Sequence, residues 1–174
     1  MKNTTIALAL IGLATFATGA TAADPRAVAL LFGADSHGLS QREQSSILDL
    51  TGLRLAPSGD LFLDAICALP AAAAAQFFDL NHDGVPEVLV VFGNSCTSGL
   101  AGQSLGLFVK RGGRYRFNLG FPGISATPLA TGNLGYDDLL IGGPGNCAPV
   151  WRWSGREYEF LRNQPQAPGG CNGR

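Results

Sequence analysis

The sequence has few charged residues. Asp, Glu, Lys and Arg make up 14% of its 174 residues, against roughly 25% in an average soluble domain. The net charge is −1, and it becomes more negative when an N-terminal leader containing Lys2 is removed. A nucleic-acid partner requires a basic footprint. The charge balance therefore argues against nucleic-acid binding.

Several motifs that would indicate a redox, zinc or phosphate site are also missing. No Cys-x-x-Cys pair occurs, which leaves a thioredoxin-like redox site without support. The chain has two histidines and four widely spaced cysteines, a poor basis for a zinc site. The Gly-rich stretch at residues 142–145 lacks the spacing of a dinucleotide or P-loop motif, so we do not expect a phosphate cradle there.

Residues 1–23 have the pattern of a secretory signal peptide. Lys2 supplies the positive start, Ile6 to Ala17 the apolar stretch, and Ala20 to Ala22 the small residues at the cleavage spacing. The apolar stretch is too short for a membrane span, and no later run reaches about 18 residues. We therefore expect a periplasmic or secreted protein with no membrane span in its mature chain.

All four cysteines follow this leader. An even number of cysteines in an oxidising compartment favours two disulfides. We predict the pairs Cys67–Cys96 and Cys147–Cys171, one of three possible pairings, because Cys96 and Cys147 hold equivalent places in an internal repeat.

The remaining pattern indicates one α+β, mainly β domain over residues 24–162, followed by a Pro- and Gly-rich tail over 163–174. Capping signals bound two short N-terminal helices, between Asp24 and Gly33 and between Ser40 and about Leu50. Short apolar runs separated by Gly and Pro turns then predict antiparallel strands. The run from Pro70 to Ala75 is ambiguous, since alanine favours a helix and the following residues suit a strand.

Two stretches of the chain match each other. Pro86–Cys96 aligns without gaps to Asp137–Cys147 at an offset of 51, and the match resumes from Leu107 at an offset of 43. Shared Gly, Tyr and Cys positions favour a true repeat. We expect an antiparallel sheet built from two related units, at about residues 76–117 and 128–160, which bury faces that neither could bury alone.

The strongest local motif is the loop at residues 79–87, Asp-Leu-Asn-His-Asp-Gly-Val-Pro-Glu. Alternate positions carry oxygen ligands, and Gly84 permits a sharp turn. Hard oxygen ligands in this number suit Ca²⁺. An EF-hand would need an acid at position 12, where Val90 stands. The predicted ligands are the side chains of Asp79, Asn81, Asp83 and Glu87 and the carbonyl of Val85.

This loop resembles the calcium loop of FG-GAP and VCBS repeats, as in integrin-type propeller blades. Their pattern is Asp-x-Asp/Asn-x-Asp-Gly-x-x-Asp before a hydrophobic strand. Asp79, Asn81, Asp83 and Gly84 match it, and Glu87 replaces the final Asp. The resemblance covers the loop and the strand after it. It implies a Ca²⁺ ligand set with a structural role, although two units cannot close a propeller.

The loop also has an alternative interpretation that needs no metal. Its carboxylates could instead cap backbone N–H groups in an Asx-turn without metal. In the second unit, Ala130–Asp138 keeps Gly135 and Asp138 but lacks the other acids, so we expect no metal there. The layout as a whole is similar to small exported bacterial proteins that carry such a loop and have no assigned activity.

Other candidate residues are weaker. His37 follows Asp35 and Ser36, but adjacent residues on one loop do not make a catalytic triad. Paired acids that could act in general acid/base catalysis, although such pairs are common on surfaces, are Asp137 with Asp138 and Glu157 with Glu159. Trp151 and Trp153 share one strand face, which suits either core packing or a glycan- or protein-binding surface.

The sequence therefore predicts an exported, non-enzymatic binding or interaction protein with a structural Ca²⁺ loop. Its partner would be an unknown protein or glycan. One alternative is an inhibitor or immunity-type protein that acts on a cell-wall enzyme. The other is an Asp/Glu-dependent hydrolase, which would need a concave cluster of buried, perturbed carboxylates away from the metal loop.

Overall fold

The computed structural model describes residues 23–63, 69–99 and 102–172. The predicted signal peptide, apart from Ala23, and Cys67 lie outside these residues. In chain order the described elements are α1 (Pro25–Phe32), α2 (Gln41–Thr51), β1 (Leu53–Leu55), β2 (Leu61–Leu63), β3 (Ala72–Phe78), β4 (Glu87–Gly93), α3 (Ser95–Ser98), β5 (Ser104–Arg111), β6 (Arg114–Pro122), β7 (Ser125–Asn133), β8 (Tyr136–Gly142), β9 (Cys147–Trp153) and β10 (Tyr158–Pro165).

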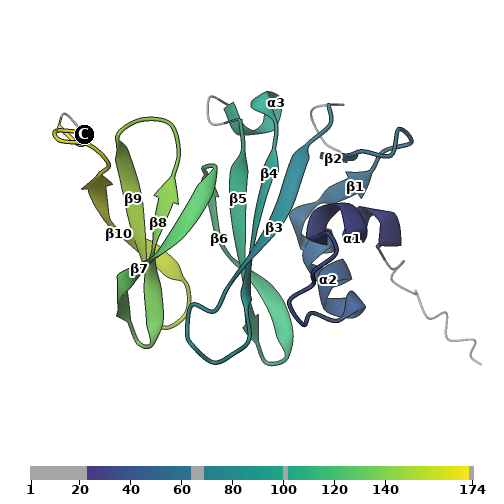
Figure 1. Ribbon diagram of the computed structural model, residues 1–174, viewed down its shortest axis with the longest axis horizontal. Helices are drawn as coiled ribbons and strands as arrows, with labels where there is room; N and C mark the ends of the chain where they lie inside the picture. The colour runs from purple at the N-terminus through teal and green to yellow at the C-terminus, as the bar shows by residue number, and fades with distance from the viewer. Residues whose placement is uncertain (1–22, 64–68, 100–101, 173–174) are drawn as a thin grey trace, which may run out of the picture.

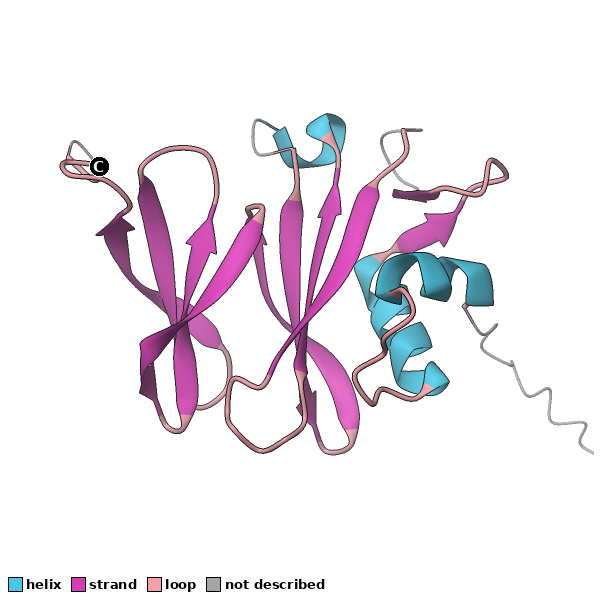
Figure 2. Cartoon of the chain, in the orientation of Figure 1, coloured by secondary structure: helices cyan, strands magenta, loops and turns pink. Residues whose placement is uncertain are grey.

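The elements form three layers side by side (Figure 1). One layer holds α1, α2 and the β1–β2 hairpin. The next is a central sheet with strand order β3-β4-β5-β6, and the last is an outer sheet with order β10-β9-β8-β7. Every strand pair is antiparallel. The prediction of a mainly β protein with antiparallel sheets is therefore confirmed, and strands dominate the view in Figure 2.

Both helices of the first layer begin and end at capping residues. The Asp24 side chain accepts the Arg26 N–H at the start of α1, and Ser40 forms a reciprocal capping box with Glu43 at the start of α2. Gly52, in the left-handed region at φ +75°, ends α2. Apolar residues of the two helices pack on one face of the central sheet.

The central sheet is covered on both faces, and β4 shows how. Val88 and Val90 point toward the helices, whereas Leu89 and Val91 point toward the outer sheet. Successive side chains of a strand point to opposite faces, so a strand buried on both sides is apolar throughout. This explains the uninterrupted apolar run over residues 88–92.

The second core cluster lies between the two sheets. Leu89, Leu105 and Leu107 of the central sheet pack against Leu139 and Ile141 of the outer one, and all five are at most 1% exposed. At about 25 cal/mol per Å² of buried apolar surface, this contact is the main force that holds the sheets together.

Three segments differ from the sequence pattern. The ambiguous alanine run is strand β3, paired along its length with β4, and its small side chains let α1 lie close. Strand β7 has no apolar alternation and forms through pairing with β8. Strand β10 continues to Pro165, three residues into the predicted tail, because residues 163–165 pair with β9.

The tail is joined to the outer sheet by the Cys147–Cys171 disulfide, which confirms that half of the predicted pairing. Cys96 is also disulfide-bonded, and its predicted partner, Cys67, lies outside the described residues. No helix in the described part of the chain is long and apolar enough to cross a membrane.

Candidate metal loop and buried carboxylates

The candidate metal loop connects β3 to β4 at the lower end of the sheets in Figure 1, between the central and the outer sheet. The Asp79 carboxylate accepts the N–H groups of Asp83 and Gly84, both at 3.0 Å. The Asp83 carboxylate accepts the Val85 N–H at 2.8 Å. Gly84 has a φ of +81°, which a glycine adopts without steric cost. These bonds curl the loop around its own oxygen atoms.

The predicted ligands differ in exposure. Asp79 and Asp83 are exposed, Asn81 and Val85 are half-buried, and Glu87 is buried. Among the residues that the structure describes, no group of three or more His, Cys, Asp or Glu side chains is placed to hold a metal ion. Two of the five predicted ligands, an amide and a backbone carbonyl, are of other types. All of the predicted ligand atoms are oxygens, which Ca²⁺ prefers. In this structure the carboxylates of Asp79 and Asp83 accept hydrogen bonds from backbone N–H groups.

The loop also touches the outer sheet, which the sequence did not indicate. The Asp137 N–H donates to the Leu80 carbonyl at 2.8 Å, and the Asn81 side-chain amide donates to the Tyr136 hydroxyl at 3.1 Å. His82 Nε2 lies 3.2 Å from a carboxylate oxygen of Asp137. Leu80 itself is fully buried in the inter-sheet core. The loop is therefore a bridge between the two sheets.

Glu87 is the buried acid of this region. Its carboxylate accepts the Leu80 N–H at 2.8 Å, and its side chain is 2% exposed. The pKa of Glu87 is raised to about 7, mainly by burial and in smaller part by the nearby carboxylates of Asp83 and Asp79. None of the ion pairs between described residues includes Glu87. This buried carboxyl group thus has hydrogen-bond partners but no cationic one.

Asp138 is a second buried acid, and it aligns with Glu87 at the offset of 51. It is 0% exposed. Arg152 donates two hydrogen bonds to it, at 2.8 and 2.7 Å, and the Thr131 hydroxyl donates a third at 2.7 Å. Hydrogen bonding to Arg152 is the main cause that lowers the pKa of Asp138. The two aligned acids therefore differ in one respect, since only Asp138 is neutralised by a side-chain cation.

Apart from Asp137 and Asp138, the other acid/base candidates have different surroundings. His37 packs its ring against Phe77, with ring centroids 4.2 Å apart, and its imidazole lies 3.6 Å from the Asp35 carboxylate. Glu157 and Glu159 are exposed. Residues 102–106 read Gly-Gln-Ser-Leu-Gly, the pattern of a nucleophile elbow. An elbow places its serine on a turn from strand to helix, whereas Ser104 is the first residue of β5 and donates to the Ser98 hydroxyl at 3.1 Å.

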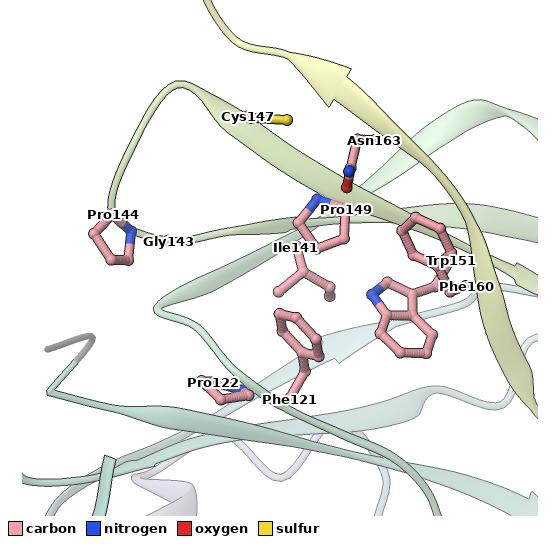
Figure 3. A pocket seen from close by; sticks show the side chains of 10 residues that line it. All are labelled: Phe121, Pro122, Ile141, Gly143, Pro144, Cys147, Pro149, Trp151, Phe160 and Asn163. Atoms are coloured by element: carbon pink, nitrogen blue, oxygen red, sulfur yellow. The ribbon is translucent and has the colours of Figure 1, made fainter. Parts of the chain in front are cut away.

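Trp151 and Trp153, which share one face of strand β9, have different surroundings. Trp153 and Tyr158 are buried in the inter-sheet core, which is the packing role. Trp151 instead lines a cavity of about 470 Å³ between the sheets, together with Phe121 of β6 (Figure 3). Its Nε1 atom is the one buried side-chain nitrogen or oxygen of the described residues that has no hydrogen-bond partner. Such a group costs about 1–3 kcal/mol.

Comparisons with known proteins give no relative from which a role could be transferred. No family model, no curated protein and no solved structure matches this chain.

Proposed function

We propose that the protein is an exported binding protein whose loop at residues 79–87 holds one Ca²⁺ ion, and that the ion stabilises the junction of the two sheets. Asp79, Asn81, Asp83 and Glu87 would supply side-chain oxygens and Val85 its carbonyl. The ion would replace the backbone N–H groups as partners of the Asp79 carboxylate. Bound Ca²⁺ would supply positive charge beside Glu87, which has no ion-pair partner among the described residues.

The observation that carries this proposal is the contrast between the two buried acids. Removing the cation from a buried ion pair costs about 3–5 kcal/mol. At Asp138 the charge is balanced by Arg152, at 2.7 Å. Within the described part of the chain no side chain forms an ion pair with Glu87, and two further carboxylates, those of Asp83 and Asp79, help to raise its pKa. A divalent cation is the partner that this arrangement lacks.

Matching hydrogen bonds in the two sheets support descent from one repeat. The Tyr115 hydroxyl donates to the Pro86 carbonyl at 2.8 Å, and the Tyr158 hydroxyl donates to the Asp137 carbonyl at 2.7 Å. The tyrosines align at the offset of 43 and the carbonyls at the offset of 51. Each unit is also a four-stranded antiparallel meander, which is the form of a propeller blade. The second unit would have lost its metal and gained Arg152.

Export is supported by the leader pattern and by the Cys147–Cys171 disulfide, which persists in oxidising compartments. Calcium sites of extracellular modules need a Kd of only about 10⁻⁴–10⁻³ M. A structural site of that strength suits a protein outside the cytoplasm. The function would then be to present a rigid surface to another macromolecule, a protein or a glycan.

Calorimetric titration with Ca²⁺ tests the site. We expect one ion per chain for the wild-type protein and no binding for Asp79→Asn, because that change removes a charged ligand while it keeps an oxygen to accept the loop N–H groups. Asp49→Asn, which removes a carboxylate from α2, is the matched control and should bind as the wild type does. If Asp79→Asn binds Ca²⁺ with unchanged affinity, the assignment of the site is wrong.

A further inference from the structure

A second cavity lies between the first turns of α2 and the turn that joins β5 to β6. Both elements stand in the lower half of the molecule in Figure 1, and the ion pair between Lys110 and Glu43 joins them. The cavity volume of about 510 Å³ falls within the range of roughly 300–1,000 Å³ that ligand sites occupy. We propose that this cavity binds a phosphate monoester group, which Arg42 and Arg114 hold from opposite walls.

The two arginines of this cavity have no partner in the protein. Arg42 stands in the first turn of α2, and Arg114 is the first residue of β6. Both are exposed, and neither side chain forms a hydrogen bond or an ion pair with another described residue. Arg26 and Arg152, in contrast, are paired with acids. The cavity therefore presents two free guanidinium groups to a ligand.

The acid on the cavity walls does not balance these charges. Glu43 is the one acid among the described residues that line the cavity, and it already pairs with Lys110 at 2.8 Å. Its carboxylate also accepts the Ser40 N–H and hydroxyl. The neighbouring sequence adds positive charge, because residues 110–116 contain four of the 12 Lys and Arg residues of the chain and no acid. Although the net charge of the chain is −1, this end of the molecule attracts anions.

A phosphate monoester matches these walls in charge and in hydrogen bonding. It carries a charge of about −1.5 to −2 at pH 7 and three acceptor oxygens. Each guanidinium group can donate two parallel hydrogen bonds to such oxygens. The Ser46 hydroxyl, which is exposed and unbonded among the described residues, can donate another. A carboxylate carries a single charge and would leave one arginine unbalanced.

The titration of the ligand should set the pH dependence of binding. The second pKa of a phosphate monoester is about 6. On the walls, the hydrogen bond from Lys110 is the main cause that lowers the pKa of Glu43 to about 2, and burial raises the pKa of Tyr115 to about 12. An arginine side chain does not lose its proton in proteins. Binding should therefore strengthen roughly fivefold between pH 5 and pH 8, as the ligand gains its second charge close to a guanidinium group.

The test is calorimetric titration with glycerol phosphate in EDTA, with glycerate as the matched carboxylate. We expect one bound glycerol phosphate per chain at pH 8, with a Kd at least fivefold below that of glycerate. Arg42→Gln and Arg114→Gln should each raise this Kd about tenfold, the value of one hydrogen bond to a charged group. Their melting temperatures should match the wild type, because neither side chain has a partner in the protein. Arg54→Gln removes a cation outside the cavity and is the control.

Four results would overturn the proposal. They are an unchanged Kd in both Arg42→Gln and Arg114→Gln, an equal loss in Arg54→Gln, equal Kd values for glycerate and glycerol phosphate, and equal Kd values for glycerol phosphate at pH 5 and pH 8. Flotation with vesicles that contain phosphatidic acid identifies the source of the group. Capture of the wild type but not of the two variants, without binding of glycerol phosphate, would assign the phosphate to a lipid headgroup. Binding of glycerol phosphate assigns it to a soluble ligand.

This inference goes beyond the proposed role of the metal loop and does not depend on Ca²⁺. EDTA prevents Ca²⁺ from bridging the phosphate to the protein, so the two proposals fail separately. Binding of glycerol phosphate by a protein that binds no Ca²⁺ refutes only the metal site. One bound Ca²⁺ per chain, without binding of glycerol phosphate or of the vesicles, refutes only the phosphate site.

Discussion

Replacing Glu87 by glutamine should stabilise the metal-free protein at pH 8 and leave its stability unchanged near pH 4. Burial raises the pKa of Glu87 to about 7 from its ordinary value of 4.5. Because the pKa is higher in the folded protein than in the unfolded chain, the protonated form of Glu87 favours folding and the ionised form opposes it. That contribution is complete below pH 4.5 and is lost as the pH rises through about 7.

The size of the effect follows from the two pKa values. The pKa of Glu87 differs by about 2.5 between the folded and the unfolded protein. At 1.36 kcal/mol for each pKa unit, this difference corresponds to on the order of 3 kcal/mol of unfolding free energy. Glutamine keeps an oxygen to accept the Leu80 N–H, which lies 2.8 Å from the carboxylate, and removes only the charge. The unfolding free energy of Glu87→Gln minus that of the wild type should therefore rise from about 0 at pH 4 to on the order of 3 kcal/mol at pH 8.

The assay is urea unfolding in EDTA at a series of pH values, followed by tryptophan fluorescence. Subtraction of the wild-type curve cancels the titration of all other groups. Glu157→Gln, at an exposed position, is the control and should give a flat difference. Added Ca²⁺ should stabilise the wild type and not Glu87→Gln. A flat difference for Glu87→Gln between pH 4 and 8 would refute the reasoning that Glu87 is a buried acid without a cation.

Three other changes test the surrounding structure. Arg152→Met leaves Asp138 buried without its cation and should cost about 3–5 kcal/mol in urea unfolding at pH 7; a loss below about 1 kcal/mol would contradict the pair's role. Lys110, at 2.8 Å, is the main cause that lowers the pKa of Glu43 to about 2. The ionised Glu43 carboxylate therefore stabilises the folded protein above pH 4.5, and this contribution is lost as the pH falls through about 2. Glu43→Gln should therefore cost on the order of 1–3 kcal/mol at pH 6 and almost nothing at pH 2, measured by thermal unfolding at both values. Cys171→Ser opens a disulfide of sequence separation 24 and should cost about 3 kcal/mol; an equal melting temperature of variant and wild type without reductant would refute this.

The sequence predicts a structural element correctly where neighbouring residues alone determine it. A capping box needs only Ser40 and Glu43, three residues apart, and α2 begins there. The apolar run of β4 marks a strand buried on both faces. The nine residues of the candidate metal loop contain all of its predicted ligands, and Ca²⁺ binding there stays a prediction.

Features that depend on distant parts of the chain could not be predicted. The alanines of β3 have a helical propensity, which pairing with β4 overrides. The contacts of the loop with Tyr136 and Asp137 join residues about 55 positions apart. The pairing of Asp138 with Arg152 needs the register of β8 and β9. One distant feature could have been found in the sequence. The internal alignment places Asp138 opposite Glu87, which indicates a second buried acid at the equivalent position.

If the loop at residues 79–87 binds Ca²⁺ as proposed, the ion should stabilise the contact between the two sheets. The most direct test is the hydrogen exchange of the Asp137 amide, because its N–H donates to the Leu80 carbonyl across the junction at 2.8 Å. We predict that saturating Ca²⁺ slows this exchange roughly tenfold or more, the effect of about 1.4 kcal/mol on local opening, and that Asp79→Asn abolishes the slowing. An exchange rate of Asp137 that is the same in Ca²⁺ and in EDTA would contradict the claim.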